Sequence, residues 1–228
     1  MANFHTHLGV GALASVGVAV AGFSTQLYGL TTALLCAIIG TLGSLLPDID
    51  LEHSRPAAQG FLVVSLITST LITILYANRY SGDELILHSL MVWAVGFLVL
   101  RFGVFETFSR LTTHRGMVHS IPYMAVFALV VVCGAFYGLH LTAFVSWLFG
   151  LVLFIGSMVH LLLDEIYSVD AFGLRLKQSF GTAIKLFEKD KLVQYACLYL
   201  VLGVLYYFAP PYQDLWRGLV RITRQLMG

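Results

Sequence analysis

Two residues at the end of a long apolar run, His160 and Asp164, are the clearest candidates for chemistry in this sequence. They are four positions apart, so on a helix both side chains would project from one face, about one turn from each other. An imidazole and a carboxylate placed in this way suit two ligands of one metal ion. A satisfied histidine beside a helix-terminal acid would account for the pair equally well. The pair alone therefore leaves both interpretations open.

Three other stretches, each next to an apolar run, carry the same kinds of side chain. The first is His5-Thr6-His7, in which His7 is the better candidate because it is nearer the first apolar helix. The second is Pro47-Asp48-Ile49-Asp50, where proline interrupts a helix and a cation would relieve the repulsion between two aspartates. In the third, His114 and His119 are too far apart for one helical face, so both would reach a metal only from a loop. Four stretches together favour a metal site.

These stretches supply more ligands than one catalytic ion needs. A catalytic zinc commonly has three protein ligands and an open position, so this number of ligands fits two ions, or three. Two ions roughly 3.5–4 Å apart suit phosphoester hydrolysis, because they stabilise both the attacking and the leaving oxygen. Imidazoles and carboxylates without sulfur suit zinc, with manganese or iron as alternatives. The predicted ligands are His7, Asp48, Asp50, His114, His119, His160 and Asp164.

Three residues are candidates for the catalytic step. Arg115 presents a guanidinium fork that suits phosphate oxygens, although a loop arginine reaching lipid head groups is nearly as good an interpretation. Glu106 is a candidate general base, and an ion pair with Arg101 is the simpler alternative. Asp50 is counted here as well as among the ligands.

The composition identifies an integral membrane protein. The chain has 228 residues, of which 58% are hydrophobic and 11% charged, and its mean hydropathy is +0.85. An ordinary soluble domain is excluded by these values. The net charge of +1 and the lack of a basic run give no sign of a nucleic-acid partner.

The hydropathy pattern predicts an all-α polytopic bundle. A crossing helix needs roughly 20 residues, and the two glycine-rich spans at the N-terminus are expected to be interior helices. Alternating crossings would put all four metal-type stretches on one side of the membrane. We expect one domain over 1–228, with a motif-bearing core at about 5–165 and a surface segment plus C-terminal helices at about 166–228. The seven predicted spans are 8–23, 30–46, 58–77, 86–105, 121–138, 142–163 and 192–208.

Basic residues predict the orientation. The loops on the side of the metal-type stretches carry more Lys and Arg than those on the other side, so this side is expected to be cytoplasmic. Arg217, Arg221 and Arg224 are opposite a row of leucines and isoleucine, the pattern of an amphipathic helix on a membrane surface. If 192–208 were a re-entrant hairpin, this tail would be cytoplasmic too. Both possibilities stay open.

In their order along the chain, the four stretches resemble a known family. Thr6-His7-Leu8-Gly9, L-P-D-I-D, H-R-G-x-x-H-S and H-L-L-L-D look like the bacterial inner-membrane metal-dependent hydrolases of YdjM type, also described as LexA-binding and membrane-associated. The resemblance covers residues 5 to about 165. It implies a helical membrane hydrolase, distantly similar to zinc-dependent phospholipases C, with the seven ligands named above. Glu165-Ile166-Tyr167-Ser168 departs from the pattern of relatives after the last motif, which affects the expected pocket and not the ligands.

The function expected from these observations is hydrolysis of a phosphoester in a lipid or lipid-linked substrate at the cytoplasmic face of a bacterial inner membrane. A metal-dependent deacylase or amidase acting on a lipid is the nearest alternative, because activated water also attacks carbonyl groups. An ion transporter would place ionisable groups near mid-helix, where this sequence has few. A non-catalytic metal protein that binds a cytosolic regulator through 164–191 is the third alternative.

Overall fold

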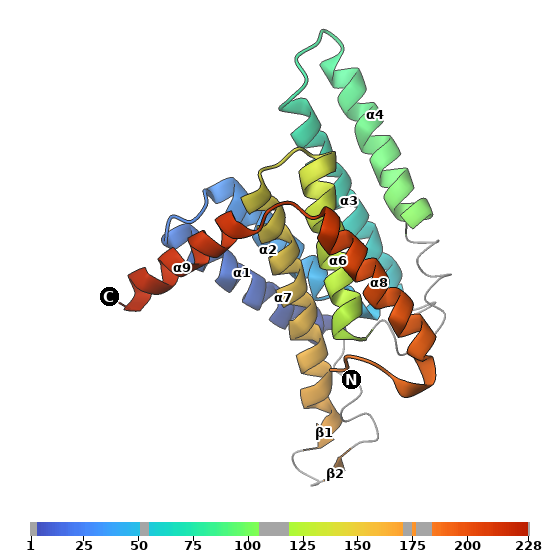
Figure 1. Ribbon diagram of the computed structural model, residues 1–228. Helices are drawn as coiled ribbons and strands as arrows, with labels where there is room; N and C mark the ends of the chain where they lie inside the picture. The colour runs from blue at the N-terminus through green and yellow to red at the C-terminus, as the bar shows by residue number, and fades with distance from the viewer. Residues whose placement is uncertain (1–3, 51–54, 105–118, 171–174, 177–183, 228) are drawn as a thin grey trace. The chain divides into compact units, whose positions relative to one another are not determined.

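The computed structural model of the chain describes residues 4–50, 55–104, 119–170, 175–176 and 184–227 (Figure 1). It divides into two compact units. Unit 1 comprises Met1–Pro47 and Gly116–Gly228, and unit 2 comprises Asp48–Arg115. The expectation of a single domain stays a prediction.

Unit 1 is built almost entirely from helices. Two short segments form an antiparallel ladder, in which Val169 pairs with Leu176 and Asp170 with Arg175. The short segments are β1 (Val169–Asp170), β2 (Arg175–Leu176), the π-helical turn η3 (Gly134–Gly138) and the 3-10 turn η4 (Lys189–Lys191). The helices are α1 (Phe4–Ser24), α2 (Leu30–Gly43), α6 (Ile121–Cys133), α7 (Ala143–Ser168), α8 (Leu192–Phe208) and α9 (Gln213–Met227).

Unit 2 contains a helix pair. The helix α3 (Arg55–Ala77) packs against α4 (Leu85–Leu98), which continues as the π-helical turn η2 (Val99–Val104). The Trp93 indole donates a hydrogen bond to Thr70 Oγ1 at 3.1 Å between these helices. The 3-10 turn η1 (Pro47–Asp50) begins with the last residue of unit 1.

The long helix α7 organises unit 1, because it packs against α1, α2 and α6. Its residues Leu148, Phe149 and Val152 are buried together with small residues of α1 and α2. At Gly43 and Gly156 a Cβ atom would collide with the main chain of the facing helix, so α2 and α7 are in backbone contact. Small residues permit this approach, which is a common way to pack helices in lipid.

The membrane character of the fold agrees with the sequence prediction, although several bounds differ. By length and composition, five helical stretches among the described residues could cross a membrane: 4–24, 85–103, 121–138, 143–167 and 189–208. The span expected at 30–46 is shorter, since α2 ends at Gly43. In α3 the apolar stretch is the shorter Thr68–Ala77. The chain is thus an all-α polytopic membrane protein.

Two details of single helices differ from the expectation. Leu13, Val20 and Leu34 are exposed and only one face of α1 and of α2 is buried, so neither helix is enclosed on all sides as an interior helix would be. The helix α7 continues to Ser168, five residues beyond the expected span 142–163. Asp164 therefore lies within the helix, on the same face as His160.

The helix α8 runs beside α6 in the same direction. Near the start of α6, the Ile121 amide donates to the Lys185 carbonyl at 3.1 Å, and Tyr199 of α8 donates to the carbonyl of Leu186 at 3.0 Å. At the other end of α6, the Tyr137 hydroxyl donates to the Phe208 carbonyl at 2.7 Å. These contacts favour a crossing for 192–208 over a re-entrant hairpin. The tail helix α9 therefore begins at the end of unit 1 that carries Tyr137 (Figure 1).

Candidate metal centre

The centre of the site is Asp164, which projects from α7 and is only 4% exposed. Three imidazole nitrogens surround its carboxylate. His7 Nε2 lies 3.2 Å from Oδ1, His160 Nε2 lies 3.6 Å from Oδ2, and His119 Nε2 lies 3.8 Å from Oδ2. The cluster thus joins the start of α1, His119 two residues before the start of α6, and the end of α7. The expectation that His160 and Asp164 share one helical face is confirmed.

His160 is held by the end of α2. The side chain is fully buried, and its Nδ1 lies 2.7 Å from the Ser44 carbonyl oxygen. A carbonyl can only accept a hydrogen bond, so Nδ1 carries the proton when the imidazole is neutral. The other nitrogen, Nε2, then presents a lone pair towards Asp164. A second hydrogen bond that orients the ring in this way is usual for metal-binding histidines.

His7 stacks on His160, with ring centroids 3.7 Å apart and planes inclined by 13°. It is 1% exposed, whereas His5, two residues earlier on the same helix, is exposed to solvent or lipid. The preference for His7 over His5 thus agrees with the structure. Within the described part of the chain, His7 Nδ1 is buried without a hydrogen-bond partner. Buried polar atoms normally have a partner, so this nitrogen favours a bound group.

The donor set fits a divalent transition metal. Ligand atoms of His119, His160 and Asp164 all lie within 4.8 Å of one another, a spacing that could hold one ion. Imidazole and carboxylate ligands suit zinc, manganese or iron. The residues of unit 1 therefore fit a metal, and the number of ions and their identity stay predictions.

The other predicted site residues lie in the turn η1 or outside the described residues. Asp48 is 9% exposed and belongs to unit 2, joined directly to Pro47 of unit 1. Asp50 ends the turn η1, so the expected non-helical segment is a short 3-10 helix. His114, Arg115 and Glu106 lie outside the described residues.

The sequence analysis did not identify Ser44 as a contributor to the site. Its main-chain oxygen contacts His160, and its hydroxyl donates to the Thr41 carbonyl at 2.8 Å. Ser44 also occupies the space beside Gly11, where a Cβ atom would collide with it. The available signal was the row of small residues before Pro47, which indicated close packing and not a role at a metal. Every residue type has a main-chain carbonyl, so the amino-acid sequence does not reveal which one will accept a hydrogen bond at the site.

The fold and this cluster define a polytopic helical membrane protein with a buried histidine–aspartate centre. The chain belongs to the YdjM inner membrane protein family, whose family model matches residues 1–213. The match includes every predicted site residue and ends at the start of α9. No curated protein and no solved structure matches the chain significantly.

Proposed function

We propose that the protein is a membrane-bound, metal-dependent hydrolase that cleaves a phosphoester of a lipid or lipid-linked substrate. The observation that carries this proposal is the convergence of three imidazoles on the buried carboxylate of Asp164. His7, His119, His160 and Asp164 would hold the metal. When bound, a divalent ion supplies Lewis acidity that activates water and polarises a phosphoryl oxygen.

The proposal also includes predicted residues that are close in sequence to the Asp164 cluster. Asp48 follows Ser44 by four residues, and the Ser44 carbonyl is bonded to His160, so Asp48 is tethered close to the centre in sequence. We assign Asp48, Asp50 and His114 as further ligands, which would allow two ions or three. Arg115 would bind the phosphate oxygens. Glu106 would accept a proton from the attacking water.

A lipid substrate is favoured by where the cluster lies along α7. Asp164 comes within three residues of the end of the apolar stretch 143–167, at the depth where a crossing helix meets lipid head groups. In the reaction, a water oxygen adds to phosphorus and the P–O bond to the alcohol breaks, with one proton passing to the alcohol. A soluble substrate would have no need of a site at this depth.

The test compares Asp164→Asn with Asp190→Asn in the full-length protein purified in detergent. Asp190 is exposed in η4, whereas Asp164 is buried among the imidazoles. We expect Asp164→Asn to lose bound metal and to reduce phosphodiester hydrolysis, with bis(p-nitrophenyl) phosphate and phospholipid as probes, by at least about 100-fold. Asp190→Asn should behave as the parent protein. Full metal content and activity in Asp164→Asn would refute the proposal.

We also propose that the Asp164 cluster faces the cytoplasm. In the topology predicted from the sequence, the side with the metal-type stretches carries eight Lys and Arg residues, against four on the opposite side when the tail is counted there. Because α8 runs beside α6 for its whole length, the C-terminus should then be periplasmic. An alkaline phosphatase fused to Gly228 is expected to be active. An inactive phosphatase fusion together with a fluorescent GFP fusion would reverse the assignment.

A further inference from the structure

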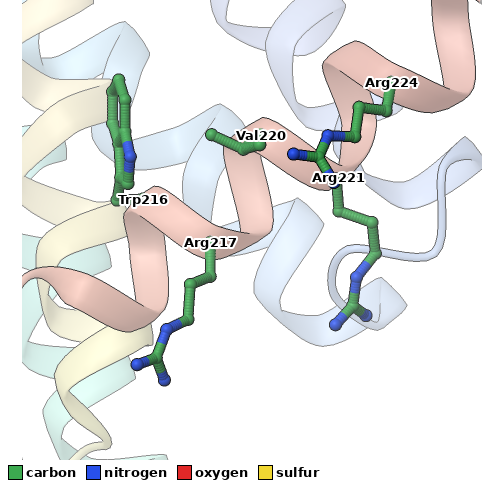
Figure 2. Close-up of a pocket in the computed structure, with 5 residues that line it drawn as sticks. All are labelled: Trp216, Arg217, Val220, Arg221 and Arg224. Carbon is green, nitrogen blue, oxygen red and sulfur yellow. The ribbon is translucent and has the colours of Figure 1, made fainter.

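Polar side chains outside the Asp164 cluster differ in burial. Arg217, Arg221 and Arg224 are exposed on α9, and the side chains of Arg217 and Arg221 extend away from Trp216 (Figure 2). Arginines are usually found at such exposed positions, where the surroundings of the protein can satisfy their charge. A buried hydroxyl has no such source of hydrogen bonds. One hydroxyl of this kind lies between α6 and α8, at the end of unit 1 that carries the Asp164 cluster.

This hydroxyl belongs to Tyr195, which is 2% exposed although most residues of α8 are exposed. Its oxygen is buried as well and makes no hydrogen bond of ordinary geometry with a described residue. A buried hydroxyl without a partner is unfavourable, and a phenylalanine would fill the same space without this disadvantage. The hydroxyl is therefore expected to have a role.

Two hydrogen bonds bring the first turns of α8 to the start of α6. The Ile121 amide donates to the Lys185 carbonyl at 3.1 Å, and the Tyr199 hydroxyl donates to the Leu186 carbonyl at 3.0 Å. The two accepting residues are adjacent in the chain, and Tyr199 is one helical turn after Tyr195. Because α6 and α8 also pack against each other, Tyr195 lies at the start of α6.

The side chain that the Tyr195 hydroxyl meets there is Ser120, which directly follows His119. Ser120 is fully buried and immediately precedes α6. A serine at this position commonly accepts a hydrogen bond from an amide of the first helical turn. The Ser120 hydroxyl makes no such bond, so it does not serve as a helix cap. It lies against Tyr195 instead.

We propose that Tyr195 is a positioning residue for the metal ligand His119. In the metal-loaded protein, the Tyr195 hydroxyl forms a hydrogen bond with the Ser120 hydroxyl, and this bond fixes the main chain from which His119 reaches Asp164. A hydroxyl can both donate and accept, so the two groups satisfy each other. The inference rests on the metal centre of the proposed function.

His119 needs such support more than the other two imidazoles do. Its Nε2 is 3.8 Å from the Asp164 carboxylate, against 3.2 Å for His7 and 3.6 Å for His160. His7 and His160 both project from helices, and a main-chain carbonyl orients the His160 ring. His119 precedes its helix by two residues, so the neighbouring chain must determine its place. Partners of this kind contribute measurably to metal affinity.

The test measures zinc affinity by chelator competition in the full-length protein in detergent. We expect Tyr195→Phe to weaken zinc binding by about 10-fold, the lower end of the effect usual for groups that orient a ligand. Tyr207→Phe, which removes an 82% exposed hydroxyl from the same helix, should bind zinc as the parent protein does. Parent affinity in Tyr195→Phe, with zinc lost in Asp164→Asn, would overturn this inference and leave the metal centre intact. If Asp164→Asn also keeps its zinc, the metal centre itself is refuted.

Double variants test the route through Ser120 and His119. Ser120→Ala should weaken zinc binding as much as Tyr195→Phe does, and the two substitutions together should weaken it no further. In a His119→Ala protein, Tyr195→Phe should have no additional effect on zinc affinity. Thermal melts establish that each variant is folded. If Tyr195→Phe weakens zinc binding equally with and without His119, the tyrosine acts through general packing and the positioning role is wrong.

Discussion

His160 Nδ1 lies 2.7 Å from the main-chain oxygen of Ser44, a contact that links the end of α2 to the candidate metal centre on α7. The two residues are 116 positions apart, so this contact depends on the close approach of the two helices. The carbonyl fixes which nitrogen carries the proton, and hence which nitrogen can bind a metal.

This relationship predicts the ligand atom of His160. In protein labelled with ¹⁵N-histidine and loaded with ¹¹³Cd²⁺, we expect cadmium–nitrogen coupling to Nε2 of His160, with the proton on Nδ1. The readout is an NMR spectrum compared with that of His160→Ala, which identifies the signal. Coupling to Nδ1 would mean that the Ser44 contact does not orient the ring in the metal-loaded protein.

The two histidines of α1 provide a matched pair of variants. His7 is 1% exposed and 3.2 Å from Asp164, whereas His5 is exposed. We predict that His7→Ala lowers the zinc content of purified protein and its affinity for zinc by at least about tenfold, while His5→Ala leaves both unchanged. Elemental analysis after dialysis against a weak chelator is the measurement. An equal effect of both substitutions would point to the N-terminus as a whole.

Much of this fold could be predicted from the sequence, because lipid imposes long apolar helices whatever their partners are. All seven expected spans contain a helix, and the i, i+4 pair of His160 and Asp164 lies on one face as predicted. The choice of His7 over His5 also follows from position alone.

The rest depends on tertiary contacts that local sequence does not encode. The Ser44 carbonyl enters the site because α2 ends at Gly43, four residues before Pro47, which was expected to end the helix. The tail helix α9 looked like a surface helix, since its arginines and leucines segregate in the same way whether lipid or protein covers the apolar face. The position of Leu27 and Phe144 beside Gly218, together with the burial of Leu215, distinguishes the two cases.

Close packing of α2 and α7 predicts a stability effect. A Cβ atom at Gly156 would collide with the Gly40 carbonyl oxygen, so Gly156→Ala must push the helices apart. We expect a net loss of about 1–3 kcal/mol and a lower melting temperature, together with weaker metal binding because His160 moves away from Ser44.

Gly203 of α8 is the control for this substitution. A Cβ atom there would meet nothing within 4 Å, so Gly203→Ala should be neutral or stabilising by up to about 1 kcal/mol. Thermal unfolding in detergent compares the two variants. A Gly156→Ala protein as stable as Gly203→Ala would show that the helix contact can relax without cost.

The segment before α8 predicts a pH-dependent contact. The Glu188 carboxylate lies 3.3 Å from both Lys185 Nζ and Lys191 Nζ. Partial burial disfavours its charge, but the two ammonium groups outweigh this and hold the pKa of Glu188 below its usual 4.5. A carboxyl whose pKa is lowered in the folded state stabilises it above the unfolded pKa, and this contribution is lost as pH falls through the folded pKa.

This ion-pair group supports the Lys185 carbonyl, which accepts the Ile121 amide at the start of α6. Glu188→Gln should therefore speed hydrogen exchange of the Ile121 amide at neutral pH, with an effect below about 1 kcal/mol because the group is partly exposed. Acidification below the usual glutamate pKa of 4.5 should loosen this amide in the parent protein and have little effect in the variant. Asp190→Asn, at an exposed position in the same turn, is the control. If Ile121 exchanges equally in all three proteins, the start of α6 is held by its apolar contacts and the glutamate has no part in positioning neighbouring His119.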